Sequence, residues 1–129
     1  MIEVYIDGAS AGDPGQSGAG IFIKGHGRAE EYSIPLGVMS NHLAEFHALI
    51  EALKICKKQG YTVVSFRTDS QAVEAAMEKR FAKKLEYRHL LEEALSIADG
   101  FELFFIKWIP SRQNKMADTL SRKAIHLNE

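Results

Sequence analysis

Residues 2–8 have the sequence IEVYIDG, an apolar run that ends at Asp7 and leads directly into the glycine-rich segment 8–15, GASAGDPG. The run predicts a β-strand and the glycines predict a turn. A second apolar run, residues 63–68 (VVSFRT), ends at Asp69 and leads into a helical pattern. In open α/β sheets, ligand-binding sites lie at the carboxyl ends of neighbouring strands. We therefore expect Asp7 and Asp69 to lie close together.

The rest of the chain predicts the element order β-β-β-α-β-α-α-β-α. Residues 20–25 and 29–36 read as two further strands, joined by a glycine-flanked turn, and form an antiparallel meander with the first. Apolar residues recur at helical spacing from Ser40-Asn41 until Gly60. Glu45 lies at the edge of that apolar stripe, where a carboxylate can face a cleft.

The C-terminal half predicts two short helices, residues 71–77 capped by Ser70 and residues 87–98. The aromatic segment 101–109 lacks a helical period and predicts a buried parallel strand, with Phe104, Phe105 and Trp108 in the core. A loop then leads into a final helix that carries Asp118 near its start. The residues of this helix expected to face the core are Met116, Ala117, Leu120, Ala124 and Leu127.

Length and composition indicate a single globular domain, residues 1–129, with 46% hydrophobic and 26% charged residues. No apolar stretch is long enough to span a bilayer and the N-terminus lacks a secretion signal, so we expect a cytoplasmic monomer without membrane association. The single cysteine, Cys56, predicts a small core residue rather than a disulfide. The net charge of −1 gives no overall steering towards a polyanion, so any nucleic-acid role must rest on local charge.

Asp7, Glu45, Asp69 and Asp118 are the acidic residues whose contexts place carboxylates at one mouth of the sheet. Carboxylates drawn together repel one another, so they need either raised pKa values or bound cations. Oxygen ligands without cysteine or paired histidines favour Mg²⁺ or Mn²⁺ over zinc. Two such ions can drive an in-line displacement, and phosphodiester hydrolysis is the reaction that this set predicts.

Four motifs carry a resemblance to a known family: residues 6–10 (IDGAS), 41–45 (NHLAE), 68–71 (TDSQ) and 114–120 (NKMADTL). Their order and spacing, across nearly the whole chain, resemble type 1 ribonuclease H. The resemblance implies an α/β fold with a five-stranded mixed sheet in the order 3-2-1-4-5, flanked by about four helices. It also implies an endonuclease that cleaves the RNA strand of RNA–DNA hybrids with Mg²⁺ and leaves 5′-phosphate products.

The same resemblance implies roles for the four acids. Asp7 would bridge both metal ions, Glu45 and Asp69 would complete one shell and hold the attacking water, and Asp118 would hold the second ion. Asn41 and Gln71 would read the minor groove of the hybrid and Ser40 would lie near the DNA phosphate. The full set expected to contact nucleic acid is Gly8, Ser10, Gly12, Ser40, Asn41, Gln71, Arg112 and Asn114.

The chain departs from the family pattern in two segments and at one residue. The loop 110–114 (PSRQN) has no histidine, and Arg112 is predicted to take its catalytic place by contacting phosphate without shuttling a proton. The short segment 79–84 (KRFAKK) stands where the family archetype has a basic protrusion, and Asp13 stands where a neutral amide is usual. These departures predict slow turnover and weak, salt-sensitive binding.

The five histidines, at positions 26, 42, 47, 89 and 126, lack metal-ligand spacing and are expected to be exposed or at the core edge. His42 is the exception, because it adjoins Asn41 where substrate could be touched.

Three functions remain open from the sequence. The first is a ribonuclease H enzyme. The second is a protein that keeps the fold, the metal site and nucleic-acid binding but hydrolyses little or nothing. The third is another nuclease of the wider fold, such as a resolvase or integrase, against which residues 68–71 and 114–120 argue.

Overall fold

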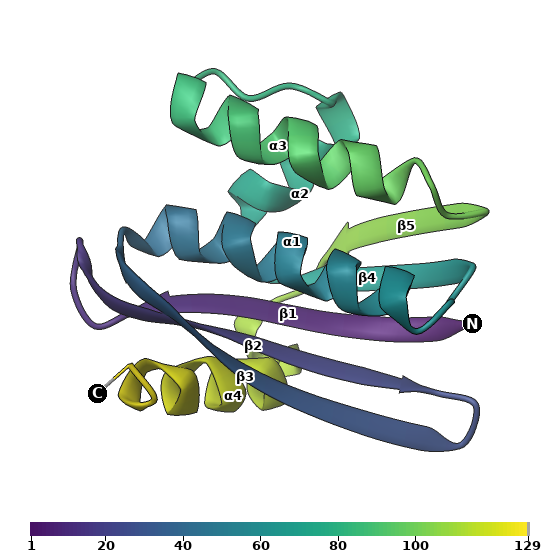
Figure 1. The fold of residues 1–129 in the computed structure, drawn as a ribbon, viewed down its shortest axis with the longest axis horizontal. Helices are drawn as coiled ribbons and strands as arrows, with labels where there is room; N and C mark the ends of the chain where they lie inside the picture. Colours follow the sequence, from purple (N-terminus) through teal and green to yellow (C-terminus); the bar gives the residue numbers. More distant parts are fainter. Residues whose placement is uncertain (129) are drawn as a thin grey trace.

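The computed structural model describes residues 1–128, which form a mixed five-stranded sheet flanked by helices (Figure 1). The strands are β1 (Ile2–Ser10), β2 (Gly15–Gly25), β3 (Arg28–Met39), β4 (Val63–Thr68) and β5 (Leu103–Trp108). The helices are α1 (Asn41–Lys58), α2 (Gln71–Lys79), α3 (Leu85–Ala98), the 3-10 turn η1 (Ser111–Gln113) and α4 (Lys115–His126).

The sheet has the order β3-β2-β1-β4-β5, which confirms the predicted order and element sequence. β1, β2 and β3 pair antiparallel, whereas β4 pairs parallel with both β1 and β5. The parallel pairing brings the carboxyl ends of β1 and β4 side by side, which is the arrangement that positions a site at their ends.

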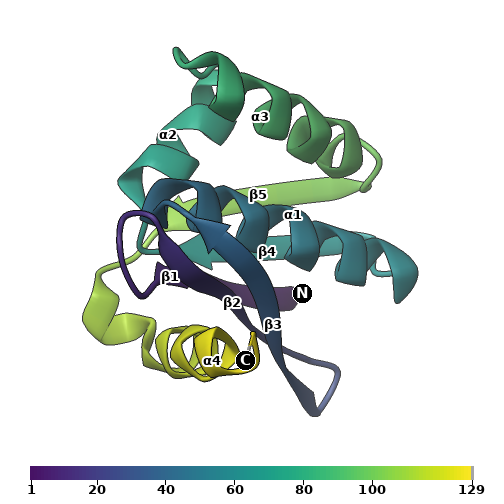
Figure 2. The same ribbon diagram turned by 60° about the vertical axis from the view of Figure 1, so that its left-hand side comes forward.

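Helices cover both faces of the sheet (Figures 1 and 2). α1, α2 and α3 lie on one face, where Val4, Ile6 and Phe66 of the sheet and Leu49 and Leu53 of α1 are almost completely buried. α4 lies on the other face, against β1, β2 and β3. None of the helices within residues 1–128 is long and apolar enough to cross a membrane.

Several strand boundaries differ from the prediction: β3 runs to Met39 rather than to residue 36, and β5 spans Leu103–Trp108 rather than 101–109. β1 continues past Asp7 to Ser10, and β2 begins at Gly15 rather than Gly20. The segment 8–10 pairs with the segment 17–19, so its backbone hydrogen bonds are made within the sheet. The predicted turn is therefore limited to residues between 11 and 14.

The prediction that β5 is a buried strand is wrong, because β5 is an edge strand with β4 as its neighbour. Phe105 is 48% exposed and Trp108 is 43% exposed, whereas Phe104 is half-buried against Phe66. The aromatic run correctly predicted a strand, but it did not show that this strand lies at the edge of the sheet.

The core-facing side of α4 is only partly as predicted. Ala117, Leu120 and Ala124 are buried, whereas Met116 and Leu127 are exposed. Met116 lies in the first turn of α4, and Leu127 lies past its last helical residue, at the C-cap. Cys56 is buried, as expected.

Candidate active site

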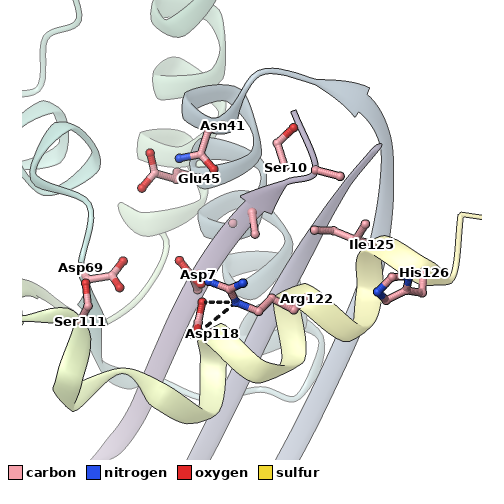
Figure 3. Close-up of a pocket in the computed structure, with 13 residues that line it drawn as sticks. Asp7, Ser10, Asn41, Glu45, Asp69, Ser111, Asp118, Arg122, Ile125 and His126 are labelled. Carbon is pink, nitrogen blue, oxygen red and sulfur yellow. Dashed lines mark hydrogen bonds and ion pairs between the residues drawn. The ribbon is translucent and has the colours of Figure 1, made fainter. Parts of the chain in front are cut away.

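The predicted acidic residues converge at one cavity. Asp7 of β1, Glu45 of α1, Asp69 at the end of β4 and Asp118 of α4 line the same cavity of about 720 Å³ (Figure 3). Each comes from a different element, so the cavity lies where β1, β4 and the start of two helices meet. The convergence of Asp7 and Asp69 follows from the parallel pairing of their strands.

Two serine caps fix the helices beside these acids. The Ser40 hydroxyl accepts a hydrogen bond from the Leu43 amide at 3.2 Å, which sets the start of α1 before Glu45. The Ser70 hydroxyl accepts from the Val73 amide, also at 3.2 Å, and sets the start of α2 directly after Asp69. Such caps satisfy the otherwise unpaired amides of a first helical turn and hold its geometry.

A glycine allows β1 and α1 to approach closely. A Cβ atom added at Gly8 would lie 2.2 Å from the carbonyl oxygen of Ala44 and 2.5 Å from the amide nitrogen of Glu45. Only a residue without a side chain fits there. The contact brings Glu45 next to the strand that carries Asp7.

Asn114 ties the start of α4 to β1. Its Nδ2 donates a 2.9 Å hydrogen bond to the carbonyl oxygen of Ile6, and its side chain is 1% exposed. This bond fixes the first turn of α4, with Asp118, beside the residue that precedes Asp7.

The Asp7 carboxylate has a direct partner in α4. The buried Ser121 hydroxyl lies 3.0 Å from Asp7 Oδ2 and 2.8 Å from the carbonyl oxygen of Asp118. A hydroxyl carries one proton, so it shares this donor between the two acceptors. Ser121 therefore orients Asp7, although no sequence motif singled it out.

The acids of the cavity destabilise one another's charges. Burial, followed by the charge of Asp69 and offset in part by the Ser121 hydrogen bond, raises the pKa of Asp7 to about 8. Burial also raises the pKa of Glu45, although the neighbouring His42 opposes this. A bound cation would offset both the cost of burying these carboxylates and the repulsion between them.

The donor set fits a hard divalent cation in charge and atom type, since it consists of carboxylate oxygens. Within residues 1–128, no group of three or more His, Cys, Asp or Glu side chains forms a ready-made ligand cluster. An ion held by all four carboxylates would therefore require these side chains to move closer together.

Comparison with known proteins identifies the family. A family profile described as "Reverse transcriptase-like" matches residues 5–124. The protein named "Ribonuclease HI" from Halobacterium salinarum is 31% identical over 127 residues, covering 96% of this chain. The chain belongs to the type 1 ribonuclease H family. It spans 64% of the halobacterial protein, which is less than two thirds of that relative's length.

Two further similarities extend along the chain. The protein named "Putative hydrolase EbsB" from Enterococcus faecalis is 40% identical over 127 residues, which cover 97% of this chain and 94% of that protein. The crystal structure of LC11-RNase H1 in complex with an RNA/DNA hybrid superposes with a TM-score of 0.91 at 27% identity and covers 99% of both chains. The ribonuclease H fold is thus matched over the full sheet and all flanking helices.

Several residues expected from the family to contact nucleic acid lie at the cavity. Gly8, Ser10 and Asn41 line it. Gly12 and Arg112 are exposed but are not among its lining residues, so their contact with nucleic acid stays a prediction, as does a catalytic role for Arg112.

Gln71 lines a neighbouring depression of about 530 Å³, together with Glu45, Asp69 and the exposed Trp108. The Trp108 Nε1 donates a 3.1 Å hydrogen bond to the carbonyl oxygen of Asp69. Asn114 does not line either hollow, because its buried side chain joins α4 to β1, and its contact with nucleic acid stays a prediction.

Two histidines of this ribonuclease H family member lie at the site. His42 Nδ1 is 3.3 Å from Glu45 Oε1, and His42 lines the neighbouring depression, so its contact with substrate stays a prediction. His126 of α4 lines the main cavity, as does Arg122, whose Nε lies 3.2 Å from both Asp118 oxygens. Neither Arg122 nor His126 was expected there, although they follow Asp118 by four and eight residues in the sequence.

The raised pKa of Asp7 predicts how the metal-free protein responds to pH. Between its ordinary value of 3.8 and about 8, the folded protein holds a proton on Asp7 that the unfolded chain has lost. The free energy of unfolding should therefore fall as pH rises through that window, by about 3 kcal/mol more between pH 5 and pH 8 in the wild type than in Asp7→Asn. Urea denaturation with a chelator at pH 5 and pH 8 measures this difference. Equal pH dependence in both proteins would contradict the assignment to Asp7.

Proposed function

We propose that the protein is an endonuclease that hydrolyses the RNA strand of RNA–DNA hybrids with divalent cations. The observation that carries the proposal is the convergence of four carboxylates from four elements in one cavity. Membership of the ribonuclease H family and the likeness to a structure solved with an RNA/DNA hybrid support the choice of substrate. We further propose that residues 1–129 act as one catalytic domain.

Asp7, Glu45, Asp69 and Asp118 would hold two Mg²⁺ ions, or Mn²⁺ in their place. When bound, such ions supply activation of water and neutralisation of charge on the leaving oxygen. Glu45 and Asp69 would orient the attacking water, while the Ser121 hydroxyl holds the Asp7 carboxylate in place. Attack of water on phosphorus with departure of the 3′ oxygen leaves a 5′-phosphate and a 3′-hydroxyl.

Polar groups around the acids would select the RNA strand. The exposed amide side chains of Asn41 and Gln71 and the backbone near Gly8 lie beside the carboxylates. They can hydrogen-bond 2′-hydroxyls, which DNA lacks. Cleavage should therefore require RNA at the cut, whereas the opposite strand should be read through its phosphates.

This selectivity predicts the outcome of a direct assay. A labelled RNA–DNA hybrid should be cut in its RNA strand in Mg²⁺ or Mn²⁺, and a DNA–DNA duplex of the same sequence should stay intact. Gel analysis of both duplexes, with RNA–RNA as a further control and a chelator in a parallel series, measures this. Equal cleavage of the DNA duplex would contradict the substrate assignment. Tight hybrid binding without cleavage would favour a binding protein that has lost hydrolysis.

A further inference from the structure

The main cavity extends beyond its carboxylates along α4. Arg122, Ile125 and His126 of α4 line one side of this extension, and Ser10, the last residue of β1, lies on the other side (Figure 3). The two basic side chains among the lining residues are Arg122 and His126. Among the residues that line the cavity, a polyanion that places one phosphate at the four acids therefore meets basic side chains only on the α4 side.

The spacing along α4 suits a nucleic-acid strand. Asp118, Arg122 and His126 are four residues apart, and an α-helix rises about 1.5 Å per residue, so each step is about 6 Å along the axis. Residues four apart lie on the same helical face. The row begins at a proposed metal ligand and leads away from it.

Both basic side chains are available to a ligand. Arg122 is paired with Asp118, but the guanidinium is largely exposed and such surface pairs contribute about 1 kcal/mol or less, so a phosphate can compete for it. The exposed His126 side chain has no hydrogen-bond partner among residues 1–128, and its ring can donate to an anion. The carbonyl groups at the end of α4 carry partial negative charge and repel a phosphate. Attraction of a phosphate to this end of the helix must therefore come from the side chains of Arg122 and His126.

We propose that Arg122 and His126 form a binding site for phosphates of the RNA strand beside the one that is cut, with His126 on the phosphate farther from the cut. This proposal rests on the proposed nuclease function. It means that the RNA strand runs along α4, from the four acids towards His126. His126 is a substrate-binding residue in this arrangement and takes no part in the chemical step.

The test pairs a change in the protein with a change in one phosphate. Hybrids carry a single uncharged 2′-O-methyl methylphosphonate linkage at successive RNA positions, with the 2′-O-methyl phosphate linkage as the reference. Binding to proteins carrying Asp7→Asn, with and without His126→Ala, is measured by fluorescence anisotropy. His126→Ala should weaken binding about five- to tenfold on the reference hybrid. The difference in affinity between the two proteins should disappear on the one hybrid whose neutral linkage replaces the phosphate that His126 contacts.

Two matched variants serve as controls. Lys123→Ala removes an exposed cation from α4 that does not line the cavity, and His89→Ala removes an exposed histidine from α3. Both should bind every hybrid like the parent protein. In a background with Asp7 intact, His126→Ala should raise KM with kcat unchanged.

The outcomes separate this inference from the proposed function. If His126→Ala binds normally, or loses the same factor at every neutral linkage, the phosphate site is refuted. An equal loss in Lys123→Ala would indicate only a general effect of helix charge and would refute it as well. Failure of the wild type to cleave any hybrid would instead refute the proposed function.

Discussion

Replacing Asp7 by asparagine is expected to lower kcat for hybrid cleavage about a thousandfold or more while leaving the fold intact. Burial and the neighbouring carboxylates raise the pKa of Asp7, and the Ser121 hydroxyl of α4 donates a hydrogen bond to its carboxylate. Asparagine keeps the volume and can still accept the Ser121 hydrogen bond, but it loses the charge that would hold cations. Single-turnover cleavage and far-UV circular dichroism measure the two parts of this prediction.

The matched control for this variant is Glu92→Gln, which neutralises an exposed acid on α3 far from the cavity. It should cleave at the wild-type rate. Mg²⁺ should raise the Tm of the wild type and of Glu92→Gln, but raise that of Asp7→Asn less, because one ligand is lost. Wild-type cleavage by Asp7→Asn would rule out Asp7 as a metal ligand.

Replacing Gly20 by alanine is expected to destabilise the fold by about 3 kcal/mol or more. A Cβ atom at this position of β2 would lie 2.0 Å from the carbonyl oxygen of Ala117 and 2.4 Å from the amide nitrogen of Ser121. These are backbone atoms of α4, so the whole helix would have to move away from the sheet. Cleavage should fall as well, because α4 carries Asp118 and Ser121.

Urea denaturation measures the change, with Gly100→Ala as its control. The nearest atom to a Cβ at Gly100 is the Ile97 carbonyl oxygen at 3.2 Å, and no left-handed backbone is needed there. That variant should stay within about 1 kcal/mol of the wild type. A Gly20→Ala protein of wild-type stability would show that α4 can shift at little cost.

The fold could be predicted largely from local patterns. Apolar runs that end at Asp7 and Asp69 predicted two parallel strand ends, and helical spacing placed Glu45 at an edge facing a cleft. The structure confirms the position of these three acids at one cavity. The strand order came from the family resemblance rather than from periodicity, and the structure confirms it too.

The errors arose where the answer depends on distant contacts. Segment 8–10 looked like a turn because it begins a glycine-rich stretch, but it pairs with residues 17–19 of β2, which no local pattern reveals. Phe105 and Trp108 looked buried because composition does not show that β5 lies at the sheet edge. The burial of Asn114 was not visible either, because it comes from the docking of α4.

The same cause hid the α4 side of the cavity. The helical face that carries Arg122 and His126 could be drawn from the sequence. Its orientation towards the cavity depends on α4 packing against the backbone of Gly18 and Gly20, which was not visible there.

The hydrogen bond from Asn114 to the Ile6 carbonyl also constrains when activity can arise during protein synthesis. It joins residues 108 positions apart, and the same docking event delivers Asp118 to Asp7. A ribosome-bound chain that has not yet exposed α4 can form β1 and its neighbours but has no complete set of acids. The proposed activity would therefore require that α4, Lys115–His126, has left the ribosome and docked onto the sheet.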